Sequence, residues 1–304
     1  MRDMWTLGGL RVRELVRRTW AESWQDAAFG QAGRMAFYHF LAIFPSLLIF
    51  LTLASRVPLA GPNLRSTIVG VSNEFLPEQA SWLMQEMTSE LDRRLPLGFQ
   101  FVTVCAGALW AALNGTWALV SGLNIAYEVE ERRPWWKVGI TIVGLTVALA
   151  FAGSVAFVLL FAGTAIEQRL FHQHLSFYAA AAGVRALEWA IVIGLLTFSF
   201  AVVYRFAPNL RDHRWMWSTP GAACALLLWI IATLCIRFYF EHVNNYALSY
   251  GHLNSAVMLM LWLYLTNGAI LIGGEMNSEI EKAAEHRQTE HDRDSQRVNA
   301  RSGS

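Results

Sequence analysis

Six long apolar stretches divide this chain, and each is long enough to cross a lipid bilayer as a helix. They cover roughly residues 35–54, 99–121, 138–165, 186–204, 218–237 and 254–274. At about 1.5 Å per residue, helices of this length match a hydrocarbon core about 30 Å thick. A helix also satisfies its own backbone hydrogen bonds where no water can do so. The sequence therefore predicts an all-α membrane protein, folded as a six-transmembrane helix bundle over residues 35–281.

The Arg and Lys residues between these stretches gather on one side of the predicted bundle. Seventeen lie in the two terminal segments and in the second and fourth connections, whereas five lie in the other connections, four of them in the long first loop. Positively charged residues favour the cytoplasmic side of a membrane. We therefore expect both termini in the cytoplasm, which agrees with an even number of spans. The formal net charge of +1 gives no indication of a nucleic-acid partner.

The segments outside the stretches predict further helices. In residues 1–34, apolar side chains recur every fourth position beside arginines, as in an amphipathic interfacial helix on the cytoplasmic membrane surface. This stripe consists of Val12, Val16, Trp20 and Trp24. Residues 55–98 form an outer insertion, in which helical spacing predicts a pair of helices at 63–76 and 78–92. Residues 282–304 are polar and charged, and they predict a disordered cytoplasmic tail.

Small residues recur every four positions within two of the stretches. They are Gly107, Ala111 and Gly115 in one stretch, and Gly144, Ala148, Ala152 and Ala156 in the next. Such stripes allow the backbones of two membrane helices to approach closely. We therefore predict helix contacts along both stripes.

Cysteine and histidine spacing predicts neither a metal site nor another cofactor. The three cysteines, Cys105, Cys224 and Cys235, all fall within apolar stretches, and no CxxC motif is present. His172 and His174 have no carboxylate or thiol close in the sequence to complete a metal site.

Charged residues near the ends of the stretches are candidate binding residues, because charge is costly at membrane depth. On the outer side, Arg185 and Glu188 lie three positions apart, and Arg237 and Glu241 lie four apart. Helical neighbours at these spacings can form ion pairs at the membrane interface. The alternative is an outer polar mouth that binds an anionic head group.

Further polar residues lie at the inner side and within the stretches. Arg205 ends the fourth stretch, and Glu275 follows the sixth. Asn114 and Asn267 lie inside the second and sixth stretches, where an amide can either hydrogen-bond between helices or bind a substrate.

Four groups of motifs carry a resemblance to a known family. They are Ala36-Phe37-Tyr38 with Phe44-Pro45, Leu123–Tyr127 with Glu131–Lys137, Tyr204–Leu210, and the C-terminal run from Asn245-Tyr246 to Gly273-Gly274-Glu275-Met276-Asn277. In this order, over roughly residues 25–282, they resemble the YihY/BrkB family. The resemblance implies a six-span protein of the bacterial cytoplasmic (inner) membrane. Many members of that family carry an old label, ribonuclease BN.

Ribonuclease chemistry finds little support in the residues themselves. Hydrolysis of RNA needs a metal cluster or an acid–base pair in a basic, water-filled cleft. The cytoplasmic connections, of about 16 and 13 residues, are too short to form a nuclease domain. No nucleophile–base arrangement stands out, so we expect that the protein is not an enzyme.

Two functions of different classes remain after these exclusions. In the first, the bundle transports or flips an anionic, lipid-like envelope component, and membrane lipids are its partners. In the second, it is a membrane scaffold that docks a partner protein of the envelope. A transporter should carry polar groups that reach the membrane midplane, whereas a scaffold should expose an apolar patch outside the bundle.

Overall fold

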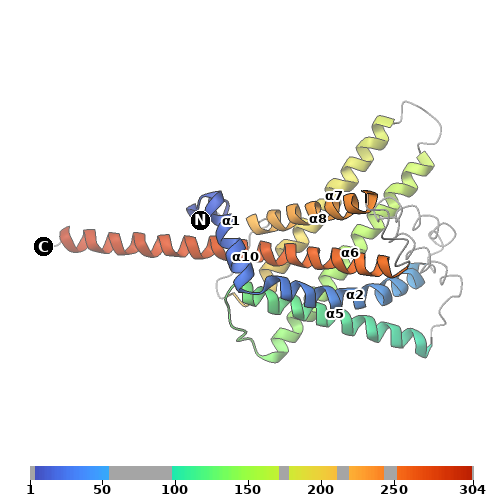
Figure 1. Cartoon of the computed structure of the whole chain (residues 1–304), viewed down its shortest axis with the longest axis horizontal. Coiled ribbons are helices and arrows are strands. Elements are labelled where there is room, and N and C mark those ends of the chain that lie inside the picture. The colour runs from blue at the N-terminus through green and yellow to red at the C-terminus, as the bar shows by residue number, and fades with distance from the viewer. Residues whose placement is uncertain (1–3, 55–97, 171–177, 211–218, 243–251, 303–304) are drawn as a thin grey trace.

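The computed structural model describes residues 4–54, 98–170, 178–210, 219–242 and 252–302. All secondary structure within these residues is helical (Figure 1). The elements are η1 (Met4–Gly9), α1 (Val12–Gln25), α2 (Ala28–Ala54), α5 (Phe99–Ala126), α6 (Trp135–Leu170), α7 (Tyr178–Phe206), α8 (Pro220–His242) and α10 (His252–Ser302). The predicted outer helical pair at 63–76 and 78–92 lies outside the described residues.

Five helices of the described part are long and apolar enough to cross a membrane. These spans are Phe101–Ala126, Trp135–Ala156, Arg185–Phe206, Pro220–Tyr239 and Ala256–Glu290. They confirm an all-helical protein with several membrane-spanning segments. The sixth expected span corresponds to α2, whose 27 residues give a helix about 40 Å long at 1.5 Å per residue. The exact number of six spans stays a prediction.

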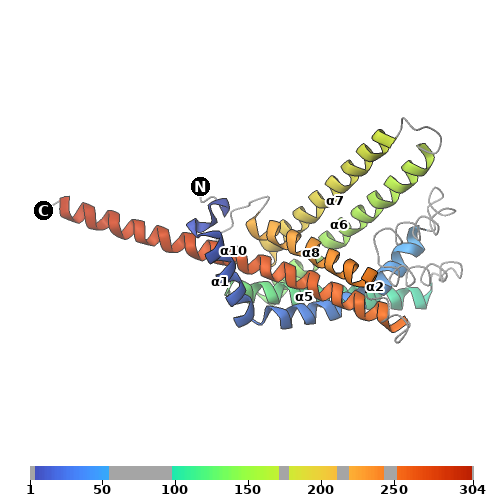
Figure 2. The ribbon, with the colours of Figure 1, turned by 45° about the horizontal axis from the view of Figure 1, so that its top comes forward.

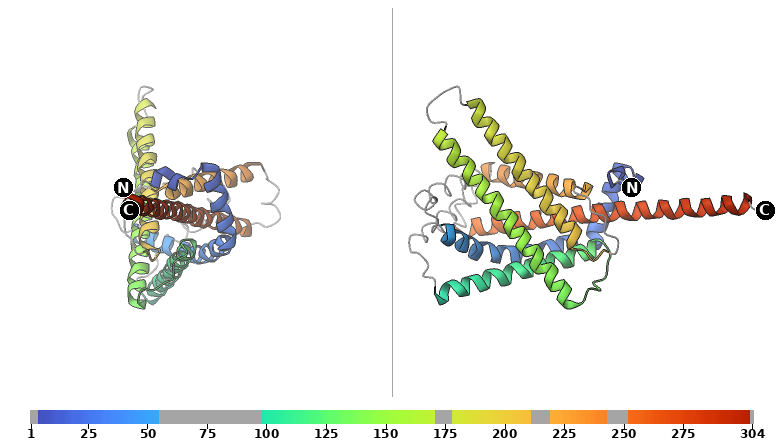
Figure 3. Two further views of the ribbon diagram at one scale, coloured as in Figure 1. Left: turned by 90° about the vertical axis from the view of Figure 1, so that its left-hand side faces the viewer. Right: turned by 180° about the vertical axis from the view of Figure 1, so that it is seen from behind.

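The six long helices form two groups. Helices α2, α5, α8 and α10 run side by side as a bundle, whereas α6 and α7 form a hairpin that diverges from them (Figures 2 and 3). The divergence leaves α6 with little cover: 6% of its spanning residues are buried, against 33% in α5 and in α10. The hairpin contacts the bundle through the first half of α6, at Leu145 and Thr146, and through the second half of α7, at Phe200 and Val203.

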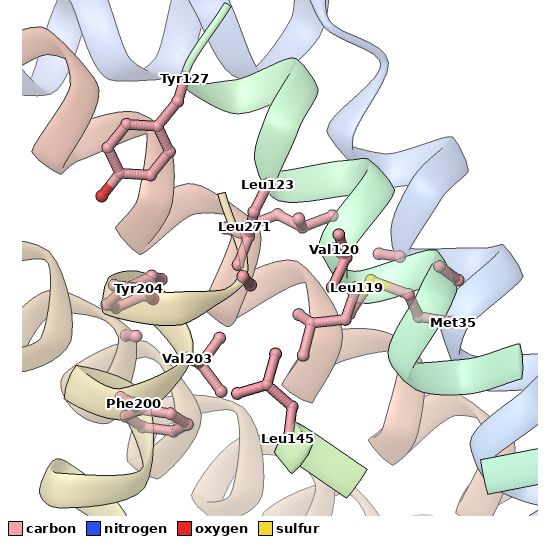
Figure 4. Packing of buried hydrophobic residues seen from close by; sticks show 14 of the residues in the cluster. Met35, Leu119, Val120, Leu123, Tyr127, Leu145, Phe200, Val203, Tyr204 and Leu271 are labelled. Carbon is pink, nitrogen blue, oxygen red and sulfur yellow. The ribbon is translucent and has the colours of Figure 1, made fainter. Parts of the chain in front are cut away.

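One apolar cluster joins the two groups where they meet. It includes Met35 of α2, Leu123 of α5, Leu145 of α6, Val203 of α7 and Leu271 of α10 (Figure 4). All of these side chains are at most 3% exposed. Burial and close packing of these side chains hold five helices together at this level.

The N-terminal segment lies across α10 at the end of the bundle (Figure 1). In α1, the buried face consists of Leu15, Thr19 and Ser23, which follow one another at intervals of four. The predicted apolar stripe is a different face and remains between 53% and 63% exposed: Val12, Val16, Trp20 and Trp24. The segment is helical as predicted. Trp20 and Trp24 contact Phe29 of α2, with ring centroids 5.8 and 4.9 Å apart, but most of the stripe remains exposed. Its position at the membrane surface stays a prediction.

The C-terminal segment differs from the disordered tail that its composition suggests. Helix α10 continues to Ser302 and projects from the bundle as a single rod (Figures 1 and 2). Residues 282–302 contain no Gly or Pro and many Ala, Glu, Gln and Arg residues, which favour helix extension. The first part of this rod is also held laterally, because the Arg287 guanidinium donates to the Gly9 carbonyl oxygen at 2.6 Å.

Candidate functional site

A clasp of hydrogen bonds closes the end of the bundle where α6 and α7 meet it. Arg133, in the α5–α6 connection, forms a two-point ion pair with Glu131 at 2.6 and 2.8 Å. The same guanidinium donates to the carbonyl oxygen of Ala207 at 3.0 Å and to that of Phe206 at 3.4 Å. These carbonyls belong to the last residue of α7 and to the residue after it, where helix geometry leaves them without a backbone partner. The α5–α6 connection is thereby bound to the end of α7.

Two asparagines complete this clasp. The Asn124 amide donates to Glu131 Oε2 at 3.0 Å, and its carbonyl oxygen accepts from the Asn209 backbone N–H at 2.8 Å. Asn209 in turn donates to the Glu130 carbonyl oxygen at 3.0 Å. Hydrogen bonds from Arg133 hold the pKa of Glu131 below its ordinary value, although partial burial opposes this. The clasp therefore contains a carboxylate that is charged at neutral pH.

A second polar contact fixes α8 against α10. The Asn277 side chain, fully buried, accepts from the Gly221 N–H at 2.9 Å and donates to Thr219 Oγ1 at 3.0 Å. Thr219 caps α8, because its hydroxyl accepts from the Ala222 N–H at 3.1 Å. The Tyr204 hydroxyl donates to the Ile270 carbonyl oxygen at 2.7 Å and brings α7 to the same region of α10.

An acidic cluster lies where α1, α2 and α10 meet at this end of the bundle. Glu275 of α10 is 1% exposed, and no hydrogen-bond donor of the described chain reaches either of its carboxylate oxygens. Asp26, in the turn between α1 and α2, has an equally unsatisfied buried Oδ2. Burial and the nearby Glu128 raise the pKa of Asp26, whereas Lys282 lowers it. The carboxyl group of Glu275 also lies close enough to lower it, because a protonated Glu275 can donate to Asp26.

Lys282 is the cation of this cluster, and other carboxylates already bind it. Its ammonium group lies 2.7 Å from Glu128 and 3.0 Å from Glu279. Glu128 directly follows Tyr127, the C-cap of α5, and adopts a left-handed backbone conformation with φ of 50°. The lysine therefore joins α10 to the α5–α6 connection and makes no hydrogen bond to Glu275 or Asp26.

A further polar pair lies deeper in the bundle. His39 of α2 faces the amide of Asn267 in α10, which is 1% exposed. A side chain at Gly115 of α5 would come within 2.7 Å of the His39 ring, so this glycine makes room for the imidazole. An ionisable group at membrane depth is costly and is a candidate for function.

Of the other residues selected from the sequence, Asn114 lies apart from these polar groups and donates to the Trp110 carbonyl oxygen of its own helix at 2.7 Å. Asn267, which His39 faces, also donates to the Leu263 carbonyl oxygen four residues earlier, at 2.8 Å. Arg205 is half-buried with its guanidinium 5.7 Å from the Phe206 ring centre.

The outer candidates are placed only in part. Arg185 and Glu188 are half-buried on α7, and Arg237 is exposed on α8. All three make further side-chain interactions. The Glu241 side chain lies outside the described side chains. Of the residues selected from the sequence, Glu275 therefore lies close to another charged group, Asp26. The role of the outer charges stays a prediction.

Sequence reasoning missed Asp26, His39 and the clasp. His39 had a signal, because it is an ionisable residue inside an apolar stretch. Asp26 had none, because an acidic residue beside an amphipathic segment usually faces water. The members of the clasp are far apart in the sequence, and their meeting depends on the packing of α5 against α7. In the described part of the chain, no three His, Cys, Asp or Glu side chains group as a metal site.

Apolar helices of membrane-spanning length, joined by buried polar contacts, define a multi-pass helical membrane protein. The chain belongs to the BrkB family: the family model described as Virulence factor BrkB matches residues 19–297. This match confirms the resemblance that the sequence motifs indicate.

The comparison with curated proteins agrees with this family. The chain is 32% identical to the putative ribonuclease-like protein YfkH of Bacillus subtilis, over 83% of this chain and 90% of that protein. It is 24% identical to a UPF0761 membrane protein of Tolumonas auensis, over 89% of this chain and 86% of that protein. A UPF0761 membrane protein of Pseudoalteromonas atlantica is 23% identical over 84% of this chain. No solved structure matches the chain.

Proposed function

We propose that this protein transports or flips an anionic, lipid-like component of the envelope across the bacterial cytoplasmic membrane. The observation that carries the proposal is the α6–α7 hairpin, which the clasp holds at one end while its helices diverge from the bundle toward the other (Figure 2). A hairpin held in this way can admit an amphipathic molecule sideways from the lipid. The acyl chains of such a substrate remain in the bilayer, so only its head group needs polar contacts.

Polar residues at three depths support this path. Arg237 and the pair Arg185 and Glu188 lie toward the outer ends of α8 and α7, and His39 and Asn267 lie within the bundle. Glu275 lies near the clasped end. An arginine fork suits phosphate and carboxylate groups, because it donates two parallel hydrogen bonds. The outer arginines are therefore the residues that we expect to bind an anionic head group.

We also propose that the role is not enzymatic, ribonuclease activity included. The α5–α6 connection, residues 127–134, and the α7–α8 connection, residues 207–219, are too short for a nuclease domain. The ribonuclease-like name of YfkH belongs to that relative.

The orientation follows from charge and from the two chain ends. The N-terminal segment and the end of α10 lie on the same side of the bundle (Figure 1), and 17 basic residues flank that side. We therefore propose that both termini are cytoplasmic, with six spans between them.

Cysteine labelling of intact cells tests the orientation. In a background without native cysteines, we expect an impermeant maleimide to label Gly70→Cys in intact cells. Glu290→Cys, on the projecting part of α10, should react only after the cells are permeabilised, which also serves as its control. Labelling of position 290 from outside intact cells would contradict the assignment.

The transport proposal predicts a graded effect at Arg237. Arg237→Lys keeps the charge but loses the planar fork, whereas Arg237→Gln loses both. In vesicles with the purified protein, movement of a fluorescent anionic phospholipid should fall in the order wild type, Lys, Gln. Loss of one charge-assisted hydrogen bond, about 1.4 kcal/mol, corresponds to a rate on the order of tenfold lower. Glu241 follows Arg237 by four positions, a spacing at which helical neighbours can form an ion pair. We therefore expect removal of Glu241 to raise head-group binding.

Two controls separate binding from folding in this assay. Arg132→Gln removes an arginine whose side chain is 65% exposed, at the opposite end of the molecule, and should leave the rate unchanged. If both Arg237 variants lose protein abundance instead of rate, Arg237 is a structural ion-pair partner and the head-group assignment is wrong.

The exposed stripe of α1 favours a second function. Large apolar side chains remain uncovered there, and the projecting part of α10 offers a long helical surface beside them. Both features suit a scaffold that docks a partner protein of the envelope. Vesicles with the wild-type protein that move lipid no faster than protein-free vesicles would favour the scaffold over the transporter.

A further inference from the structure

We propose that Glu275 and Asp26 together bind one proton at neutral pH, and that this proton is the ion coupled to transport. The coupling of this proton to transport rests on the transport role proposed above. The binding of the proton does not depend on that role and is argued from the geometry. The proton lies on a carboxyl oxygen of Glu275 and is donated to the carboxylate of Asp26.

The first argument is the burial of the two groups. Glu275 is 99% removed from solvent, and both of its carboxylate oxygens lack a donor. Asp26 Oδ2 is buried and lacks a donor as well. A carboxylate without hydrogen-bond donors is very costly to bury, and such a group takes up a proton instead. A single proton between the two carboxyl groups makes one hydrogen bond, which involves one oxygen of Glu275 and Oδ2 of Asp26 and removes one of the two charges.

The second argument is the charge balance around the pair. The charged groups that act on Glu275 are Asp26 of the α1–α2 turn, Glu22 of α1, and Glu279 and Lys282 of α10. Glu128 lies beside Asp26, and the Tyr127 hydroxyl at the end of α5 also faces Glu275. Lys282 is the one cation of this set, and Glu128 and Glu279 already bind it. Two neighbouring carboxyl groups without their own cation do not both ionise, because each disfavours the charge of the other.

The third argument is the choice of proton over a metal ion. Calcium takes six to eight oxygen ligands and magnesium demands an octahedral set. In the described residues no three acidic, His or Cys side chains are placed to share an ion. One proton needs only a donor and an acceptor oxygen, which Glu275 and Asp26 supply.

The position of the pair indicates what proton release would do. Asp26 ends α1 and precedes α2, so it lies at the turn that holds the N-terminal helix against α10. Loss of the proton leaves the buried Glu275 and the partly buried Asp26 both negatively charged, and the two charges repel across this joint. The same face of α10 carries Asn267 two turns away, about 12 Å along the helix, opposite His39. Movement at the joint is thereby transmitted along α10 toward the polar pair inside the bundle.

Infrared titration of the full-length protein tests proton binding directly. We expect wild type at neutral pH to show the carbonyl band of a protonated carboxylic acid, and to lose this band at alkaline pH. These spectra are recorded in a Glu281→Gln background, because Glu281 is a second half-buried carboxyl group on α10. In that background Glu275→Gln should lack the band, and Asp26→Asn should lose it at lower pH, because the new amide donates to a charged Glu275. Glu290→Gln, at an exposed position on the same helix, is the matched control and should keep it. A band that survives Glu275→Gln, or its absence from wild type at neutral pH, would overturn the proposal.

The coupling of the proton to transport is tested separately, in the vesicles with purified protein that serve for the lipid-movement assay. A pH difference across the membrane should change the rate of lipid movement by wild type severalfold, and Glu275→Gln should move lipid at a rate that no longer responds to it. Movement by wild type that ignores the pH difference, while the infrared band is present, would overturn coupling and leave the transport role intact. No lipid movement at any pH would instead refute the transport role, and the infrared result would decide proton binding alone.

Discussion

Replacing Gly273 or Gly221 by alanine should disrupt the contact between α8 and α10. Among the glycines of the described residues, we expect alanine at these two positions to weaken this contact most. A Cβ on Gly273 would lie 2.5 Å from the Gly221 carbonyl oxygen and even closer to the Tyr204 hydroxyl. A Cβ on Gly221 would overlap the Gly273 carbonyl oxygen and lie 2.6 Å from Asn277. Because backbone atoms are the obstacle, the helices themselves have to separate.

The expected cost follows from this separation. Overpacking of a well-packed core typically costs about 1–3 kcal/mol. We expect each of these two substitutions to cost about 3 kcal/mol or more, because it brings backbone atoms into conflict. Separation of the helices also breaks the hydrogen bonds of Asn277 to Gly221 and Thr219. We expect a loss of folded protein and a lower midpoint of thermal unfolding in detergent, followed by size-exclusion chromatography.

Two other glycines provide the control for helix propensity. Gly268→Ala, on the same helix, would place its Cβ 3.9 Å from Ala32, which is an ordinary contact, and Gly144→Ala meets nothing within 4 Å. Alanine favours a helix over glycine by about 1 kcal/mol, so both controls should match or exceed the stability of wild type. If Gly273→Ala is as stable as Gly268→Ala, the close approach of α8 and α10 is wrong.

These glycines also show the limits of sequence patterns in a membrane protein. The stripe of Gly107 and Gly115 predicted a helix contact, and Gly115 does lie against His39, whereas Gly107 has no neighbour within 4 Å. On α6, the predicted stripe makes no helix contact at Gly144, because a Cβ there would meet no atom within 4 Å. Periodicity identifies a face that can pack closely, but it does not say whether another helix covers that face. Gly221 and Gly273 each have a single small partner four positions away, Ala225 and Ala269, which is a shorter repeat than the two predicted stripes.

The apolar stretches and the family were predictable from the sequence, because both depend on local composition and motifs. The site was predictable only in part. Glu275 was selected as a charged residue at the end of a stretch, but its partner Asp26 comes from a segment more than 200 positions earlier. The continuation of α10 was not predicted, because the low hydrophobicity of residues 282–304 is typical of disorder. The helix propensity of the same residues favours the observed helix. Contacts between distant segments determine which polar residues are buried together.

Removal of the Arg133 side chain should open the clasp between the α5–α6 connection and α7. Arg133→Ala leaves Glu131 without its two-point partner and leaves the carbonyls of Phe206 and Ala207 unsatisfied. Hydrogen bonds to charged groups contribute about 1.5–3 kcal/mol each, and partial exposure of the pair, 17% and 30%, reduces this. We therefore expect destabilisation by about 2 kcal/mol, measured as a lower midpoint of thermal unfolding.

The neighbouring arginine is a matched control for this effect. Arg132 also pairs with a carboxylate, Glu130 at 2.9 Å, but both side chains are well exposed, 65% and 79%. Exposed pairs of this kind contribute about 0–1 kcal/mol. Arg132→Ala should therefore leave stability nearly unchanged, and Arg133→Lys should fall between wild type and Arg133→Ala, because it keeps charge without the fork.

The pH dependence of the clasp separates it from simple loss of packing. Since the pKa of Glu131 is lowered in the folded protein, its ion pair stabilises the fold above the ordinary carboxyl range and loses this effect as the pH falls through the lowered value. The stability difference between wild type and Glu131→Gln should therefore be full at neutral pH and shrink on acidification. In a double-mutant cycle at neutral pH, the two single changes should sum to more than the double change. Additive effects that do not vary with pH would mean that Arg133 acts through its carbonyl contacts to α7 alone, and that the ion pair does not stabilise the clasp.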